Sequence, residues 1–172
     1  MIYYTKGNIF EAKADALVNP VNCVGSMGAG LAKQFADKFP KMLKSYKDLC
    51  GRNKVVPGSV FPFKEEGLTI LNLATKDHWR FESKLEWIDQ GLMNLADVIE
   101  ELHIESVAIP ALGCGFGRLK WEDVKYLIKT HLEELDCNVF VFEPNQHKYS
   151  GKRSSGHTRP DTDQDMVLSS EK

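Results

Sequence analysis

The chain has 172 residues, enough for one domain with a real core, and its 42% apolar and 27% charged content are those of a soluble globular protein. A net charge of −2 argues against a protein that holds nucleic acid by phosphate neutralisation alone, although it allows an enzyme that contacts one nucleotide at a time. No apolar stretch is long enough to span a bilayer, and no signal-peptide pattern stands at the start.

Strand-like and helix-like segments alternate along the chain. Apolar residues such as Leu85, Ile88, Leu92 and Leu95 recur at helical spacing and predict a face that packs on the core. A turn at 65–67 is expected to close a hairpin. In chain order we expect strands at 2–5 and 16–21, helices at 29–38 and 41–49, strands at 59–64 and 69–73, a helix at 83–101, a strand at 106–109, a helix at 121–135 and a strand at 138–142.

This alternation predicts an α/β fold, with three α/β/α layers around a mixed, mostly parallel sheet. Ligands of such sheets bind at the carboxyl ends of the strands. We expect one domain over 1–145. Residues 146–172 are polar and carry too few apolar side chains to offset the entropy of ordering, which predicts a flexible tail.

Two glycine-rich loops each follow an apolar strand and precede a helix. They are Gly25-Ser26-Met27-Gly28-Ala29-Gly30 and Gly113-Cys114-Gly115-Phe116-Gly117. Glycine lets a backbone turn at positive φ and approach a ligand closely, and a helix start offers unpaired N–H groups to an anion. Two such loops in one domain predict a site that grips a diphosphate from both sides. The first loop matches neither the phosphate-loop pattern nor the dinucleotide fingerprint, whose third glycine falls at Lys33.

Lys84 is a candidate nucleophile. Ser83-Lys84-Leu85-Glu86 reads as a capping box, which places Lys84 in the first turn of a helix. The helix dipole disfavours a cation there, and a neutral amine can attack a carbonyl or an anomeric carbon. The alternative is an exposed lysine without a chemical role. No pair of carboxylates is placed for acid–base hydrolysis of a sugar, so a glycosidic reaction would need another nucleophile.

Other polar and aromatic residues have both a possible functional role and an ordinary structural one. Asn19 and Asn22 at a strand end can orient ribose hydroxyls or simply form a turn. A local basic and aromatic cluster can contribute to a binding site or be only an exposed connection, and the chain has such a cluster at Lys76-Asp77-His78-Trp79-Arg80-Phe81. The four scattered cysteines predict reduced thiols in the cytoplasm, and Cys114 is expected to pack under its loop rather than react.

Four motifs in order resemble a macrodomain over about residues 1–145. These are Gly7-Asn8-Ile9-Phe10, the run 16–22, the loop 25–30, and the run 109–115. Within that family, 27–35, 75–80 and 113–121 are similar to the branch of the antitoxin macrodomain DarG and the human terminal ADP-ribose protein glycohydrolase. The resemblance implies an enzyme that binds ADP-ribose and removes it from a modified target, thymidine in DNA first of all, through a lysine nucleophile.

The resemblance also implies a role for each site residue. Asn8 and Ile9 would meet the adenine, where many relatives have Asp in place of Asn8. Asn22 and Met27 would line the distal ribose. The human protein has an assisting aspartate where this chain has Gly117. The implied catalytic residues are Lys84 and Asn22, and the implied ADP-ribose contacts are Asn8, Ile9, Asn19, Val21, Asn22, Cys23, Met27, Gly28, Ala29, Gly30, Leu31, Thr75, Gly113, Cys114, Gly115, Phe116, Gly117, Phe142, Pro144 and Asn145.

The resemblance implies no metal or redox cofactor. The expected partners are ADP-ribose, ADP-ribosylated DNA or protein, and a DarT-like toxin that makes the modification, with the chain itself a monomer. Three alternatives stay open: an ADP-ribose reader without catalysis, a hydrolase of ADP-ribosylated glutamate or aspartate, and a hydrolase of ADP-ribose 1″-phosphate.

Overall fold

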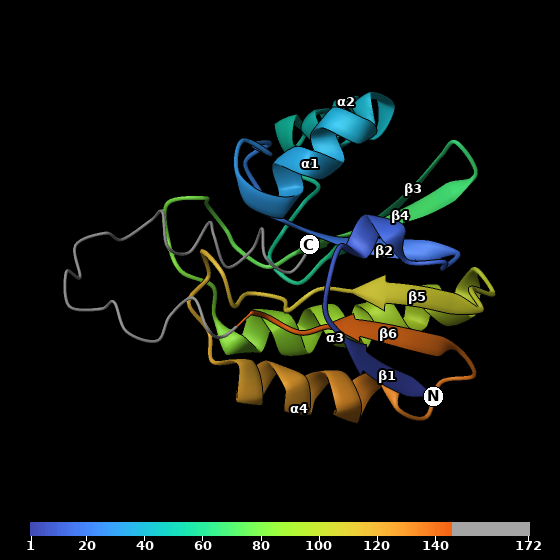
Figure 1. Ribbon diagram of the computed structural model, residues 1–172. Helices are drawn as coiled ribbons and strands as arrows, with labels where there is room; N and C mark the ends of the chain where they lie inside the picture. The colour runs from blue at the N-terminus through green and yellow to red at the C-terminus, as the bar shows by residue number, and fades with distance from the viewer. Residues whose placement is uncertain (146–172) are drawn as a thin grey trace.

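The computed structural model describes residues 1–145, so the polar tail predicted for 146–172 lies outside it. A single mixed sheet lies between two helical layers, which confirms the predicted α/β/α fold (Figure 1). None of the helices in these 145 residues is long and apolar enough to cross a membrane. The elements are β1 (Ile2–Thr5), the 3-10 helix η1 (Ile9–Glu11), β2 (Ala16–Val21), α1 (Gly30–Lys38), α2 (Pro40–Gly51), β3 (Val60–Glu65), β4 (Leu68–Ala74), α3 (Leu85–Glu101), β5 (Ser106–Ile109), α4 (Trp121–Leu132) and β6 (Asn138–Phe142).

The strand order is β1-β6-β5-β2-β4-β3, and every neighbouring pair is parallel except β3 with β4. β3 and β4 form the predicted hairpin. Its two turn residues, Glu66 and Gly67, both have positive φ, at 52° and 79°, as a type I′ turn requires. Because β2 runs parallel to both β4 and β5, these three strands end at the same edge of the sheet.

Each face of the sheet has its own core. α3 and α4 bury Ile88, Leu92 and Ile128 against one face, together with Val18 of β2. α1 and α2 cover the other face with side chains that include Phe35. The two layers lie on opposite sides of the sheet in Figure 1. Burial on both faces explains why β2 reads as a continuous apolar run rather than an alternating one.

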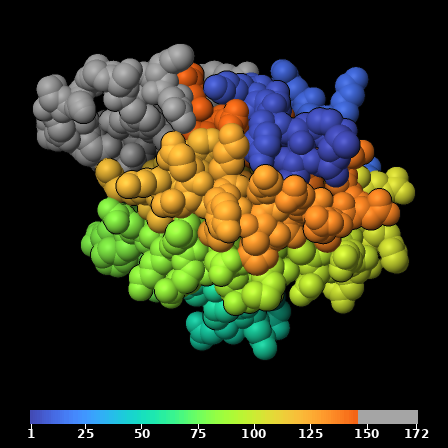
Figure 2. Space-filling view, turned by 90° about the horizontal axis from the view of Figure 1, so that it is seen from below, coloured from blue at the N-terminus to red at the C-terminus, as the bar shows by residue number. Residues whose placement is uncertain are grey.

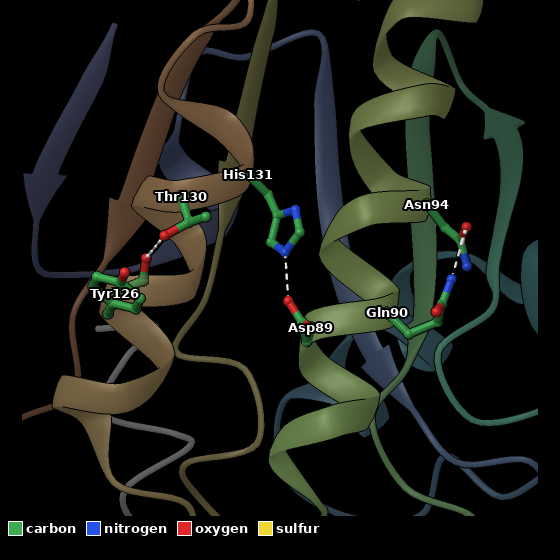
Figure 3. A network of polar contacts seen from close by, with 6 residues as sticks. All are labelled: Asp89, Gln90, Asn94, Tyr126, Thr130 and His131. Atoms are coloured by element: carbon green, nitrogen blue, oxygen red, sulfur yellow. Dashed lines mark hydrogen bonds and ion pairs between the residues drawn. The ribbon is translucent and has the colours of Figure 1, made fainter.

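A polar contact on the outer surface joins α3 to α4. The ring Nε2 of His131 on α4 lies 2.6 Å from a carboxylate oxygen of Asp89 on α3 (Figure 3). Thr130 donates to the carbonyl of Tyr126 within α4. Figure 2 looks onto this side of the molecule, where α4 lies between α3, in green, and the first residues of the chain, in dark blue. Because Asp89 is half exposed, the contact contributes little to stability.

The capping box predicted at Ser83 is wrong. α3 begins at Leu85, Lys84 is its N-cap residue, and no side chain caps this end. The Ser83 N–H instead donates to the carbonyl of Gly117, 3.1 Å away in the second glycine loop. The Ser83 hydroxyl is buried, with no hydrogen-bond partner in the described part of the chain. A contact between segments distant in sequence has therefore replaced the local cap.

A buried carboxylate holds the start of α2. Glu65, at the end of β3, is 7% exposed. Its Oε1 accepts the N–H of Met42 at 2.8 Å, and its Oε2 accepts that of Lys41 at 3.4 Å. Pro40 opens the helix, where its missing N–H costs nothing. The negative charge satisfies two N–H groups that the helix itself leaves unpaired, and it lies at the positive end of the helix dipole.

We expect Glu65→Ala to lower the free energy of unfolding by about 1–3 kcal/mol, because it leaves buried donors at the start of α2 unpaired. Urea denaturation followed by circular dichroism measures the change. Glu134→Ala, at an exposed position, is the control and should have little effect. Equal shifts in the two variants would show that the Glu65 contacts do not stabilise the fold.

Candidate functional site

A cleft of about 690 Å³ opens at the carboxyl ends of β2, β4 and β5, where the sequence places both glycine loops. Val21, Thr75 and Pro110 lie at or directly after these strand ends and form part of its floor. Its lining residues are Pro20, Val21, Asn22, Ser26, Gly28, Ala29, Leu31, Ala32, Thr75, Lys76, Trp79, Arg80, Phe81, Glu82, Pro110, Ala111, Gly113, Gly115, Phe116, Gly117, Arg118 and Pro144.

Asn22 shapes the first glycine loop from within. Its side-chain oxygen accepts the N–H of Val24 at 3.0 Å, and its Nδ2 donates to the carbonyl of Ser26 at 2.8 Å. The buried hydroxyl of Tyr46 on α2 lies 2.8 Å from both the side-chain and the backbone oxygen of Asn22. Burial raises the pKa of Tyr46, so the hydroxyl stays protonated as a donor. Asn22 is therefore fixed by its own loop and by the helix behind it.

The start of α1 faces this cleft without a cap. The N-cap residue is Ala29, whose side chain cannot accept a hydrogen bond. The first N–H groups of an α-helix have no partner inside the helix, and here Gly30, Leu31 and Ala32 occupy those positions. Leu31 and Ala32 line the cleft. Unpaired donors and the positive end of a helix dipole together favour an anion at this place.

The second glycine loop closes on itself and leaves donors free. The N–H of Leu119 donates to the carbonyl of Gly113 at 2.9 Å, and that of Arg118 to the carbonyl of Gly115 at 3.0 Å. The N–H groups of Gly115 and of the next two residues donate to no group within residues 1–145. Gly113 has a φ of +72°, which an L side chain rarely adopts. The loop therefore offers backbone N–H groups to the cleft from the side of β5.

Gly117 has no room for a side chain. A β-carbon built there would lie 2.5 Å from the carbonyl oxygen of Gly113 and 2.5 Å from the Ser83 hydroxyl. The first of these atoms belongs to the backbone and cannot yield easily. An acidic side chain at this position would require the loop to be rebuilt, so the chain has neither the assisting carboxylate nor the space for one.

The thiols near the cleft are poor nucleophiles. Burial, with the carboxylates of Glu122 and Asp123, raises the pKa of Cys114 to about 12. Burial also raises the pKa of Cys23 to about 12, where Asp77 adds to the effect. Both thiols therefore stay protonated at neutral pH. No three His, Cys, Asp or Glu side chains gather where they could hold a metal ion in the part of the chain that the structure describes.

Lys84 lies beside the cleft but does not line it. Its backbone is one residue from Ser83, which is bonded to the second loop, and its side chain is exposed. The Lys84 amine lies 5.2 Å from the centre of the Trp87 ring, one turn further along α3. Such a cation–π contact at an exposed site is worth about 0.5–1 kcal/mol, little enough for the side chain to leave it readily.

Several residues expected to contact ADP-ribose lie beneath the cleft or away from it. Asn8 caps η1, accepting the N–H of Phe10 at 2.9 Å. Asn19 is fully buried and donates to Asn72 Oδ1 at 2.9 Å, while its own Oδ1 has no partner among the described residues. The expected contacts that do not line the cleft are Asn8, Ile9, Asn19, Cys23, Met27, Gly30, Cys114, Phe142 and Asn145. Those that do are Val21, Asn22, Gly28, Ala29, Leu31, Thr75, Gly113, Gly115, Phe116, Gly117 and Pro144.

The residues on one side of the cleft, apart from the glycine loop, were not among the site residues expected from the sequence. Residues 76 and 79–82 line it, together with Arg118. The basic and aromatic run at 76–81 signals this side, but a run of exposed residues has the same pattern when it only connects two elements. Smaller lining residues such as Ala32 and Ala111 give no signal, because nothing in the sequence distinguishes them from packing positions.

Comparison with known proteins assigns the chain to a family. A sequence model of the Macro domain matches residues 18–128. The DNA ADP-ribosyl glycohydrolase of Mycobacterium tuberculosis is 43% identical over 150 residues, covering 84% of this chain and 43% of the relative. A fusion of a DNA ADP-ribosyl transferase with a DNA ADP-ribosyl glycohydrolase, from Thermosipho africanus, is 30% identical over 81% of this chain and 41% of its own length. The chain thus spans about two fifths of the length of these curated relatives.

Solved structures agree. The macrodomain of Thermus aquaticus DarG superposes with a TM-score of 0.80 at 41% identity, covering 84% of this chain and 99% of that one. The Thermosipho africanus DarTG protein, whose structure is a complex with ADP-ribose, superposes with a TM-score of 0.79 at 30% identity, over 83% of this chain and 41% of that one. On sequence and structure alike, the chain belongs to the Macro domain family.

Proposed function

We propose that the chain binds ADP-ribose in this cleft and hydrolyses an ADP-ribosyl linkage. The observation that carries the proposal is the pair of backbone loops lining one cleft, each with N–H groups that lack partners among the described residues. An uncapped helix start adds further donors. A diphosphate is the ligand that suits such a cradle, because it carries negative charge and several acceptor oxygens on two adjacent phosphates.

The proposed target is thymidine in DNA. Relatives that share the fold at 41–43% identity are a DNA ADP-ribosyl glycohydrolase and a DarG macrodomain, which supports DNA as the acceptor. The fusion of a transferase with a glycohydrolase supports a DarT-like toxin as the functional partner. We propose a monomer, because one chain supplies the whole cleft, and a cytoplasmic setting, because the four cysteines form no disulfide.

In the proposed reaction Lys84 is the nucleophile. Its neutral amine leaves the Trp87 ring, enters the cleft and attacks the anomeric carbon of the distal ribose as the bond to the base breaks, and the proton that the amine loses goes to the departing base. Water then releases the sugar from the lysine. Two observations support the assignment: the nearby thiols are held protonated, and the second loop has no space for a carboxylate at Gly117.

The second candidate is an ADP-ribose reader without catalysis. It is favoured by the position of the Lys84 side chain, which rests on Trp87 rather than in the cleft. A reader needs the cradle alone, and every donor described above would serve it equally well.

A substrate panel separates these functions. Purified protein is given ADP-ribosylated thymidine in a single-stranded oligonucleotide, an ADP-ribosylated glutamate peptide, and ADP-ribose 1″-phosphate. We expect free ADP-ribose from the oligonucleotide, measured by chromatography. If only the peptide released ADP-ribose, the target would be a glutamate side chain rather than thymidine. If only ADP-ribose 1″-phosphate reacted and gave free phosphate, the target would be that phosphate ester. If none of the three substrates reacted, the chain would be an ADP-ribose reader without catalysis.

Lys84→Ala should keep the dissociation constant for ADP-ribose within about threefold while kcat falls by about a thousandfold or more, because it removes the nucleophile and no cleft-lining group. Calorimetry gives the affinity and the oligonucleotide assay gives kcat. Lys120→Ala is the matched control, since Lys120 is an exposed N-cap residue of α4. Turnover equal to that of the control would remove Lys84 from the mechanism.

Gly28→Val should abolish ADP-ribose binding and leave the fold intact. A β-carbon at Gly28 would meet only the Ser26 hydroxyl, at 3.5 Å, so the protein tolerates a side chain that the ligand would not. We expect at least a hundredfold loss of affinity, about 2.7 kcal/mol or more. Gly51→Val, where nothing lies within 4 Å, is the control. Unchanged affinity in Gly28→Val would place the diphosphate elsewhere.

A further inference from the structure

Two large aromatic side chains stand exposed at the rim of the cleft. Trp79 is 52% exposed and Phe81 is 62% exposed, although both line the cleft. They belong to the connection between β4 and α3, here called the rim loop and defined as residues 75–82. Exposed aromatic rings forfeit the stabilisation that burial would provide, so a pair of them beside a binding cleft suggests a surface for a ligand.

The rim loop is held in shape by its own contacts. The His78 ring contacts both aromatic rings, its centroid 5.0 Å from that of Trp79 and 5.6 Å from that of Phe81. The His78 Nδ1 accepts the N–H of Arg80 at 3.0 Å. The Lys76 amine donates to the carbonyl of Trp79 at 3.1 Å. The rings are therefore presented by an organised loop, which lowers the entropy lost on binding.

Cationic groups accompany the rings. The Arg80 guanidinium lies 5.5 Å from the centre of the Trp79 ring. The Lys76 amine lies 5.5 Å from that of Phe116, in the second loop. Arg118 lines the same side of the cleft and lies 3.9 Å from Glu82. Aromatic rings interleaved with cations are the pattern that binds single-stranded nucleic acid, because bases stack on the rings while cations attract phosphates.

We propose that Trp79 and Phe81 form a stacking platform for the unpaired bases next to the modified nucleotide, and that this platform holds them outside the ADP-ribose cradle. This rests on the proposed function, because it concerns the acceptor of the same ADP-ribosyl group. A modified base inside a duplex would first have to leave the stack, whereas a single strand offers its base faces directly. A peptide acceptor has no comparable series of flat faces.

The decisive comparison uses two substrates that differ only in flanking bases. One is ADP-ribosyl-thymidine as a single nucleoside, and the other is the same nucleoside within a single-stranded oligonucleotide. Loss of one base–aromatic stack should lower kcat/KM for the oligonucleotide by about tenfold in Trp79→Ala or Phe81→Ala. Release from the nucleoside should fall by a clearly smaller factor than release from the oligonucleotide, since the nucleoside has no neighbouring bases to stack. Trp79→Phe should restore most of the activity on the oligonucleotide.

Tyr126→Ala is the matched control, because Tyr126 is 69% exposed on α4 and does not line the cleft. Equal losses on both substrates, or weaker ADP-ribose binding by calorimetry, would assign the rings to the ADP-ribose site and overturn the platform. Unchanged activity on the oligonucleotide would overturn it as well. An equal loss on an ADP-ribosylated peptide would show that the rim receives protein instead.

Binding of the modified oligonucleotide, followed by fluorescence anisotropy, keeps this proposal separate from the function on which it rests. If the unmodified protein releases nothing from DNA, the proposed hydrolase activity fails. The platform then stands if Trp79→Ala weakens binding of the oligonucleotide by a larger factor than binding of the nucleoside. The platform is contradicted if Trp79→Ala binds the oligonucleotide and the nucleoside as tightly as the protein without the substitution does.

Discussion

The cleft depends on the direction in which β2 is paired. Because β2 runs parallel to β4 on one side and to β5 on the other, the chain leaves all three strands at one edge of the sheet. After each of these strands the chain turns back toward a helix over a short distance. The turns leave backbone N–H groups without partners inside the described chain. The concentration of donors is thus a product of topology, and the glycines make it accessible to a ligand.

Two long-range contacts turn that edge into a defined site. The Tyr46 hydroxyl reaches from α2 to Asn22 and fixes the first loop against the helical layer behind it. The Ser83 N–H bonds to Gly117 and ties the start of α3 to the second loop. Both contacts couple the helical layers to the loops, so the geometry of the cradle is inherited from the packing of the whole domain.

Most of the architecture could be read from the sequence, because apolar periodicity and glycine placement are local signals that the tertiary structure reinforces. The hairpin turn at Glu66 and Gly67 is one example, since few other residues adopt its backbone angles at low cost. The start of α3 shows the limit. The local pattern at Ser83 favours a cap, but the bond to Gly117 competes with it, and its partner is 34 positions away in the chain.

The positions that line the cleft were predictable where the glycine loops supply the backbone, and less so where side chains are concerned. Gly28 and Gly115 line the cleft as expected, whereas Asn8 and Asn19 are used by the protein itself for a cap and a buried amide pair. The Lys84 side chain could not be oriented from sequence, because its choice between Trp87 and the cleft depends on neighbours brought together by folding. Exposed aromatics such as Trp79 are equally ambiguous until a cleft is found beside them.

The crowding at Gly117 also restricts how this chain can change at that position. A β-carbon there meets the Gly113 carbonyl oxygen and the Ser83 hydroxyl, so this chain can gain a reactive side chain at that position only together with further changes in the loop. Exposed positions of the rim loop, such as Trp79 and Phe81, are less constrained by packing. We therefore expect target preference to change through substitutions in the rim loop more readily than through substitutions at Gly117.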